Sequence, residues 1–113
     1  MKKKSEIRLR VWIEKGDKPF IGPGRITLLE NIATYGSISK AAAEVDMSYR
    51  KAWQLIRDMN ASAGSVLVDR QIGGKTGGGA VLTDEGQKVI KQYRQLEKEI
   101  DKALKKYEGK MTI

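Results

Sequence analysis

Residues 36–63 read GSISKAAAEVDMSYRKAWQLIRDMNASA, and they contain two short helical patterns separated by a tight polar turn. We expect Ser39 to cap the first helix, because a short hydroxyl can accept a hydrogen bond from an unpaired backbone N–H. Ala41, Ala42 and Val45 would then form the apolar side of that helix. These residues are the first half of a predicted helix-turn-helix.

The second helix should begin at its cap, Ser48, after a sharp turn at Asp46, a residue type that tolerates a left-handed backbone. Its apolar residues fall at helical spacing and predict an inward stripe of Ala52, Leu55, Ile56, Met59 and Ala63. The opposite face carries Tyr49, Arg50, Trp53, Gln54 and Arg57. Arginine can bind guanine, glutamine can pair with adenine, and Tyr, Ser and Lys can reach phosphate oxygens from a helix in the major groove. Ser48–Ala63 is therefore the predicted recognition helix, and an ordinary solvated helix face is the alternative.

Length and composition are those of one globular domain. The chain has 113 residues, of which 40% are hydrophobic, so it can form one modest core. It has 22 lysines and arginines against 14 aspartates and glutamates, and the formal charge of +8 favours an anionic partner such as nucleic acid or a membrane surface. Half of the surplus lies in residues 1–24, where Lys2, Lys3 and Lys4 could form a solvated tail.

Cysteine and histidine are both absent. Their absence removes disulfides, thiol nucleophiles and the usual zinc ligands, and it argues against an acid–base enzyme. No run approaches the ~20 apolar residues of a membrane span, and the basic start lacks the apolar region of a signal peptide. We therefore expect a cytoplasmic protein that is not an enzyme, uses no metal or cofactor and does not enter the membrane.

A β-hairpin is predicted before the helix-turn-helix. Every second residue from Ile7 to Ile13 is apolar, which is the pattern of a strand with one buried face. A turn at residues 15–17 and an extended return through Phe20 and Ile21 would complete the hairpin.

A first helix is expected from about residues 22–24 to Thr34, with Gly36 as its stop. Its buried stripe is predicted to contain Ile26, Leu29, Ile32 and Ala33. Leu28 falls on another face, where it is either core or a dimer contact, and we favour core.

A second hairpin is predicted after Gly64, which should end the second helix. Residues 66–71 read as a strand with Val66 and Val68 on one face, and the glycine-rich tip Gly73–Gly79 leads to another strand at Ala80–Leu82. A hairpin directly after a recognition helix is the wing of a winged helix, and glycines let its backbone lie close to a sugar-phosphate surface. The predicted wing contacts are Arg70, Lys75 and Thr76. A loop with no partner is the alternative for the tip.

The tip also matches the end of a phosphate-binding GxxxxGK[ST] loop at Gly74, Lys75 and Thr76. The match fails at the first glycine position, which is Asp69. It also fails in context, because a predicted strand follows where a helix N-terminus is required. Nucleotide hydrolysis is therefore a minor alternative.

From Thr83 onward the composition is helical, with Thr83 as cap and Asp84 and Glu85 in a first turn that favours anions. Apolar residues then step by four and three along Val89, Tyr93, Leu96, Ile100, Ala103 and Tyr107, which is the spacing of a coiled-coil seam. The second half of this helix would project beyond the domain, so we expect a homodimer whose symmetry matches a pseudo-palindromic DNA site. The predicted dimer contacts are Leu96, Ile100, Ala103, Leu104 and Tyr107.

Several parts of the sequence together carry a resemblance to a known family. They are GSISKAAAEVDMSYRKAWQLIRDMN, GGKTGGGAVLTDEG, RLRVWIE and FIGPGRITLLE. They resemble the N-terminal DNA-binding domain of the molybdate-responsive ModE-type transcriptional regulators, a relative of the LysR-type winged helix. The resemblance covers nearly the whole chain, and the combination of SYRKAW with GGGAVLT is quite specific.

The resemblance implies a dimeric winged-helix transcription factor with Ser48–Arg57 in the major groove and the wing beside it. Matching positions imply backbone contacts from Ser37, Ser39 and Ser48. They place nearest the bases Tyr49, Arg50, Lys51 and Gln54. Trp53 would either join these residues or brace the helix.

Regulators of this kind sense molybdate through a separate C-terminal domain, whereas this chain ends at Ile113, so we do not carry oxyanion sensing over. The chain would be a stand-alone DNA binder, a protein that works with another subunit, or a fragment. The predicted fold is mainly α with small β: one winged-helix domain, 1–113, with hairpin, helix-turn-helix and wing in 1–82 and a dimerisation helix in 83–113. The predicted function is sequence-specific binding of double-stranded DNA to regulate transcription, and the alternative is a protein-interaction module on the same scaffold.

Overall fold

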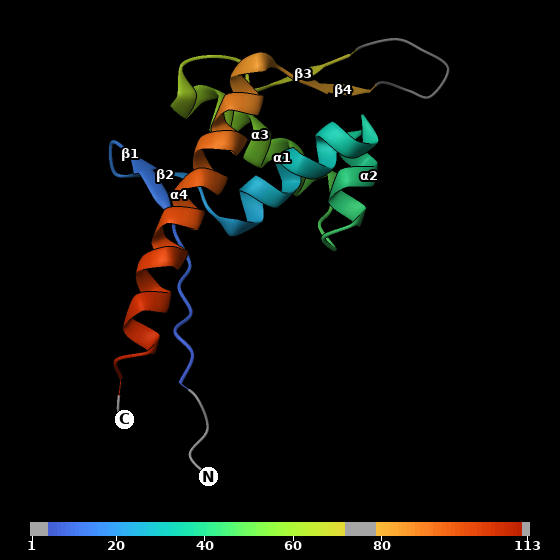
Figure 1. Cartoon of the computed structure of the whole chain (residues 1–113). Helices are drawn as coiled ribbons and strands as arrows, with labels where there is room; N and C mark the ends of the chain where they lie inside the picture. The colour runs from blue at the N-terminus through green and yellow to red at the C-terminus, as the bar shows by residue number, and fades with distance from the viewer. Residues whose placement is uncertain (1–4, 72–78, 112–113) are drawn as a thin grey trace.

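The computed structural model describes residues 5–71 and 79–111. Its elements in chain order are β1 (Ile13–Lys15), β2 (Lys18–Ile21), α1 (Pro23–Tyr35), α2 (Ile38–Ala43), α3 (Tyr49–Ala63), β3 (Val68–Arg70), β4 (Ala80–Leu82) and α4 (Asp84–Glu108). The helices α1, α2 and α3 form the body, the β3–β4 hairpin lies along one side of it, and α4 extends past it (Figure 1). Each described sheet is a two-stranded antiparallel hairpin. This arrangement confirms the predicted fold class, a winged helix with an N-terminal hairpin and a long C-terminal helix. None of the helices in the described ranges is long and apolar enough to cross a bilayer.

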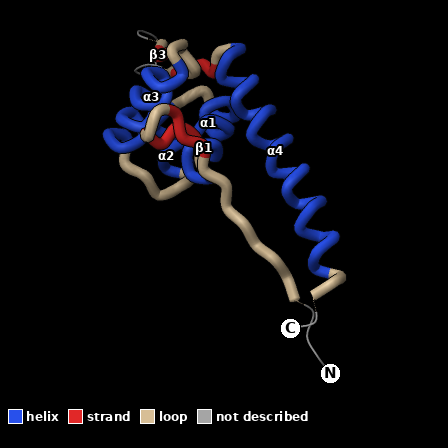
Figure 2. The backbone as a smooth tube through the Cα atoms, turned by 90° about the vertical axis from the view of Figure 1, so that its left-hand side faces the viewer, coloured by secondary structure: helices blue, strands red, loops and turns tan. Residues whose placement is uncertain are grey.

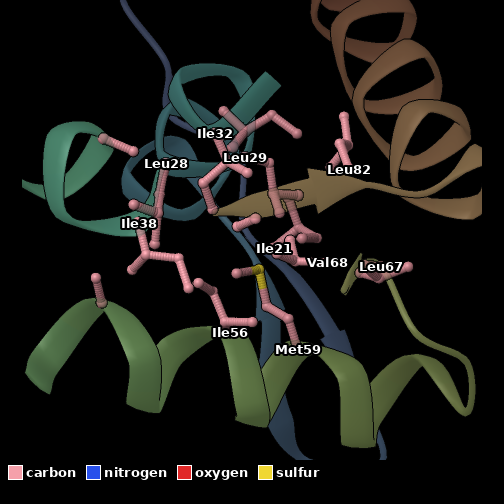
Figure 3. Packing of buried hydrophobic residues seen from close by; sticks show 14 of the residues in the cluster. Ile21, Leu28, Leu29, Ile32, Ile38, Ile56, Met59, Leu67, Val68 and Leu82 are labelled. Atoms are coloured by element: carbon pink, nitrogen blue, oxygen red, sulfur yellow. The ribbon is translucent and has the colours of Figure 1, made fainter. Parts of the chain in front are cut away.

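One hydrophobic core joins the helices of the body to both hairpins. Leu28, Leu29 and Ile32 of α1 face Ile56 and Met59 of α3 across this core (Figure 3), and each of the five is at most 1% exposed. The assignment of Leu28 to the core is therefore confirmed. Burial of these side chains, at roughly 1.5–3 kcal/mol each, fixes which face of α3 points outward.

The predicted limits of α1 are confirmed within a residue. It begins at Pro23, whose missing N–H costs nothing in a first turn. It ends at Tyr35, and the C-cap residue Gly36 adopts a left-handed φ of 63°. The prediction that Ala33 is buried was wrong, because the residues of α1 that face the core are Ile26, Leu28, Leu29 and Ile32.

The cap of α2 differs from the prediction. Ser37, and not Ser39, has the extended backbone of an N-cap, and its Oγ accepts a hydrogen bond from the Lys40 backbone N–H at 3.2 Å. The helix begins two residues earlier than expected because Ile38, which is 4% exposed, supplies its first core contact. The cap of α3 is as predicted, since Ser48 Oγ accepts from Lys51 N–H at 3.1 Å.

The turn between α2 and α3 is also as predicted. Asp46 adopts a left-handed φ of 52°. Val45 lies in this turn, after the end of α2, and is only partly buried. The short turn brings α2 and α3 together as the two helices of the helix-turn-helix (Figure 1).

The N-terminal strand is much shorter than the alternating pattern predicted. Only Ile13–Lys15 pair with β2, around a turn in which Gly16 and Asp17 both have positive φ. The reason is the length of the return strand: β2 has four residues before the chain turns into α1, so residues 7–12 have no strand to pair with. They run beside α4 instead (Figure 2).

Two long-range hydrogen bonds hold this N-terminal segment, residues 5–12, on α4. The Tyr93 hydroxyl donates to the Val11 carbonyl oxygen at 2.8 Å, and the Ile7 N–H donates to Glu108 Oε1 at 2.9 Å. A groove of about 770 Å³ lies between the segment and the helix, and Ile100 and Leu104 are among its lining residues.

The second hairpin is confirmed as antiparallel, with Val68 opposite Leu82. Its first strand begins two residues later than predicted, at Val68. Val66 is 51% exposed, whereas Leu67 and Val68 are 1% and 2% exposed, so the expected shared face of Val66 and Val68 was wrong. The alternation of buried and exposed side chains starts only at Val68. Here the side chain of Asn60 binds the backbone of Leu67 and Val68.

The helix α4 starts at its predicted cap, because Thr83 Oγ1 accepts from the Gly86 N–H at 3.1 Å. The predicted seam is packed on the body in its first half and largely exposed in its second. Tyr93 is 1% exposed against the body, while Leu96 and Tyr107, farther along the helix, are 38% and 64% exposed. The N-terminal segment covers the adjoining flank of α4, where Ile100 and Leu104 line the groove. It leaves open the flank that carries Leu96, Ala103 and Tyr107.

An ion-pair network joins α4 to α1. Arg94 Nε donates to Glu30 Oε2 at 3.1 Å, and Arg94 Nη1 donates to Glu97 Oε1 at 2.6 Å. The hydrogen bond that Arg94 donates to Glu30, followed by the one it donates to Glu97, raises the pKa of Arg94 above its ordinary value. These side chains are about one-third exposed or more, so solvent screens the attraction, and the main effect is to fix the direction of α4.

Candidate DNA-binding site

The exposed face of α3 is the centre of the candidate site. Ala52, Ile56 and Met59 are all fully buried, so the residues on the opposite side of the helix must point to solvent. In the first nine residues of α3 the exposed ones are Tyr49, Arg50, Lys51, Gln54 and Arg57. All five belong to the predicted set, and they lie in the first nine residues of α3.

Long polar side chains on this face have unused donors. Within the parts of the chain that the structure describes, Arg50, Gln54 and Arg57 form no side-chain hydrogen bond or ion pair. A guanidinium has five N–H donors in a planar fork, and an amide has both donors and an acceptor. These groups can therefore meet base edges without first breaking a contact in the protein.

The two capping serines stand at the starts of the helices α2 and α3. The oxygen of each, Ser37 Oγ and Ser48 Oγ, accepts a backbone N–H. A serine hydroxyl retains its own O–H for donation when it accepts in this way, so each serine can cap its helix and bind a phosphate oxygen at the same time. Ser39 is exposed inside α2, where its hydroxyl is not needed as a cap.

Trp53 lies at the edge of the open face, one turn after Tyr49 and one turn before Arg57. It is partly buried and packs against the core, and its ring lies 5.2 Å from the guanidinium carbon of Arg70. A bracing role for Trp53 stays a prediction. Arg70 itself is exposed on β3, and Lys75 and Thr76 lie outside the described residues. The strand β4 follows the tip, so the helix that a phosphate-binding loop requires is not what comes next.

Sequence reasoning missed Asn60. Its Oδ1 accepts from the N–H groups of Leu67 and Val68 at 2.8 and 3.3 Å, and its Nδ2 donates to the Val68 carbonyl oxygen at 3.3 Å. The available signal was a short polar amide beside the buried stripe of α3, but its partners are backbone groups seven and eight residues later, which no side-chain pattern identifies.

The geometry defines a class of protein. Two helices joined by a tight turn, the second with an open polar face, and a β-hairpin beside it form a winged helix-turn-helix (Figure 1). Helix N-termini, capping hydroxyls and cationic side chains are the groups that protein–DNA interfaces use.

Comparison with known proteins gives the family. Residues 24–87 match the bacterial regulatory helix-turn-helix proteins of the lysR family, and the chain belongs to this family. It is 46% identical over 89 residues to the DNA-binding transcriptional dual regulator ModE of Escherichia coli K12, a match that covers 79% of this chain and 33% of that protein.

Two further relatives extend the similarity. The molybdenum transport protein ModE of Azotobacter vinelandii is 49% identical over 80 residues, which is 71% of this chain and 30% of the relative. The molybdenum-pterin-binding protein MopB of Rhodobacter capsulatus is 41% identical over 93 residues, or 82% and 34%. The resemblance to ModE-type regulators is thus confirmed, and the chain spans about a third of the length of these relatives.

Proposed function

We propose that the chain binds double-stranded DNA with sequence preference and thereby regulates transcription. The observation that carries the proposal is the open face of α3, where Arg50, Gln54 and Arg57 have unused donors beside two capped helix N-termini. The lysR-family match supports it, and so does the similarity to the Escherichia coli relative, a DNA-binding transcriptional dual regulator. Such a protein would act in the cytoplasm, where bacterial DNA is.

In this proposal α3 enters the major groove. Arg50 would fork onto guanine O6 and N7, and Gln54 would pair with adenine N6 and N7, which are the pairings that distinguish base pairs there. Ser37, Ser48 and Lys51 would bind phosphates and set the register of the helix. Phosphate contacts would supply much of the affinity and make it strongly salt-dependent.

We further propose that two copies associate through the open flank of α4. Leu96 and Tyr107 are exposed on this flank, and Ala103 lies between them at helical spacing. The helix has 25 residues and extends past the body (Figures 1 and 2). Ile100 and Leu104 contribute less directly, because they line the groove beside the N-terminal segment. Two-fold symmetry would present two copies of α3 to a pseudo-palindromic site.

The competing function is a protein-interaction module that uses the same exposed face. The two functions differ in what Arg50 and Gln54 should do. Base readers lose ~1–3 kcal/mol per contact on the preferred site and little on random DNA when they are truncated. A protein-binding face would show no such difference between DNA sequences.

The test compares Arg50→Ala and Gln54→Ala with Lys106→Ala on a preferred site and on random duplex. Lys106 is exposed in the last turn of α4, so its variant removes a positive charge away from the face of α3. We expect the two α3 variants to lose affinity mainly on the preferred site, while the control stays close to the unmodified protein. Equal losses on both duplexes would contradict base reading by these residues.

A further inference from the structure

One side of α3 contacts the wing. Trp53 and Asn60 are seven residues apart, about two turns of helix, so they share a side of α3. Asn60 holds the backbone of Leu67 and Val68 through the hydrogen bonds given above. Trp53, nearer the start of the helix, lies against Arg70. The strand β3 therefore runs back along α3, fixed by Asn60 where it begins and by Trp53 where it ends.

The second strand of the wing is fixed on the opposite side. The Ala80 N–H donates to the Gly36 carbonyl oxygen at 3.0 Å, at the corner between α1 and α2. Beside this bond, the Gln71 N–H donates to the Gly79 carbonyl oxygen at 2.8 Å and continues the hairpin past Arg70. The base of the wing is thus tied to α3 and to the start of α2 together, and the main freedom left to Arg70 is that of its own side chain.

Arg70 is a cation without an anionic partner among the described residues. It is exposed, and among the described residues it forms no hydrogen bond or ion pair, only the contact with the Trp53 ring. The N–H donors of a guanidinium point outward in its own plane, and an aromatic ring covers only one face of that plane. The donors therefore remain free to bind another group. Arginine otherwise carries a large rotamer entropy that is lost when it binds. A ring that holds the side chain in place reduces this loss on binding.

We propose that Trp53 is a positioning residue, which holds the Arg70 guanidinium with its donors ready for a backbone phosphate of the DNA beside the recognition helix. The inference rests on the proposed DNA-binding function. In it, Trp53 reads no base and acts on DNA only through Arg70. The same indole packs on the core, so the recognition helix and the wing reach the DNA as one rigid unit.

A positioning role for Trp53 predicts that the losses of DNA affinity in Trp53 and Arg70 variants are not additive. A purely structural role of Trp53 would not produce this result. When Arg70 is absent, Trp53 has nothing to position, so removing both should cost no more than removing Arg70 alone. The relevant variants are Arg70→Ala, Trp53→Leu, Trp53→Phe and the double variant Trp53→Leu with Arg70→Ala. Phenylalanine retains an aromatic face for the guanidinium, whereas leucine retains only apolar volume.

The experiment titrates these variants, as the full chain, against the preferred duplex and random duplex across a salt series. We expect Arg70→Ala to weaken binding about tenfold on both duplexes and to reduce the salt slope by about one phosphate contact. Trp53→Leu should weaken binding about twofold to fivefold, Trp53→Phe should recover part of that loss, and the double variant should match Arg70→Ala. Urea unfolding of each variant identifies any loss that comes from stability.

Additive losses in the double variant, or equal binding by Trp53→Phe and Trp53→Leu, would overturn the inference while the DNA-binding function stands. An unmodified chain that shows no preference for any duplex would instead overturn the proposed function. If Trp53→Leu does not fold, the comparison of Trp53→Phe with and without Arg70→Ala gives the same test. In that case the double variant is again expected to bind as Arg70→Ala does, and a weaker double variant would reject the inference.

Discussion

Gly86→Ala should destabilise the protein although it places a better helix former in α4. Gly86 is the third residue of this helix and is buried. A Cβ at this position would lie 2.4 Å from the Leu67 carbonyl oxygen and 2.6 Å from Leu82 Cδ1. The Leu67 carbonyl is a backbone group that already accepts from Thr83 N–H at 2.9 Å and Thr83 Oγ1 at 3.0 Å. It cannot yield without disturbing both bonds.

The magnitude follows from these contacts. Alanine gains about 1 kcal/mol of helix propensity over glycine. The carbonyl must move by about 1 Å to reach ordinary contact, which weakens two hydrogen bonds of about 1 kcal/mol each and adds about 1–3 kcal/mol of overpacking. The expected net loss is about 2–4 kcal/mol, measured by urea unfolding followed by circular dichroism.

The matched control is Gly24→Ala in α1, where a Cβ would meet nothing within 4 Å. This variant should be unchanged or more stable by up to about 1 kcal/mol. The reasoning is refuted if Gly86→Ala gains stability as the control does, since propensity would then outweigh the close approach of α4 to the wing.

Three further predictions concern the caps, Tyr93 and the open flank of α4. Ser37→Ala should cost about 1 kcal/mol because it removes the cap of α2, whereas Ser39→Ala should cost under about 0.5 kcal/mol; equal costs in urea unfolding would contradict the cap assignment. Burial, the first cause, raises the pKa of Tyr93 above 10.0, so its phenol stabilises the fold fully below pH 10.0 and that contribution is lost as the pH rises through the folded-state value. Tyr93→Phe should therefore lose less stability on alkaline titration, and an unchanged alkaline slope would count against this assignment. Leu96→Glu combined with Tyr107→Glu should convert dimers to monomers in sedimentation equilibrium without loss of helicity, and a dimer that survives both changes would place the interface elsewhere.

The helix-turn-helix was predictable because its signals are local. Ser48, the left-handed turn at Asp46 and the buried stripe through Ile56 are all encoded within a few residues of the backbone they control. The same holds for the start of α4, where the cap and the acidic first turn are adjacent in sequence. The cap of α2 was misplaced by two residues because Ser37 and Ser39 offer the same chemistry, and only the burial of Ile38 distinguishes them.

The parts that sequence could not give depend on partners far along the chain. The alternation from Ile7 to Ile13 is genuine, but whether it becomes a strand depends on the length of β2 and on Tyr93, 82 residues from Val11. The partial burial of Ile100 in the α4 seam has the same origin, because that segment lines the groove beside it. Asn60 binds backbone groups, which leave no trace in the pattern of side chains.

The most direct test of the central claim selects bound sequences from a random duplex pool and titrates the winning site across a salt series. A DNA-reading winged helix predicts one recurrent pseudo-palindrome, bound with a large preference over random duplex and with affinity that falls steeply as salt increases. Recovery of no recurrent sequence, with only weak salt-sensitive binding to every duplex, would contradict the claim and favour a protein partner for the exposed face of α3.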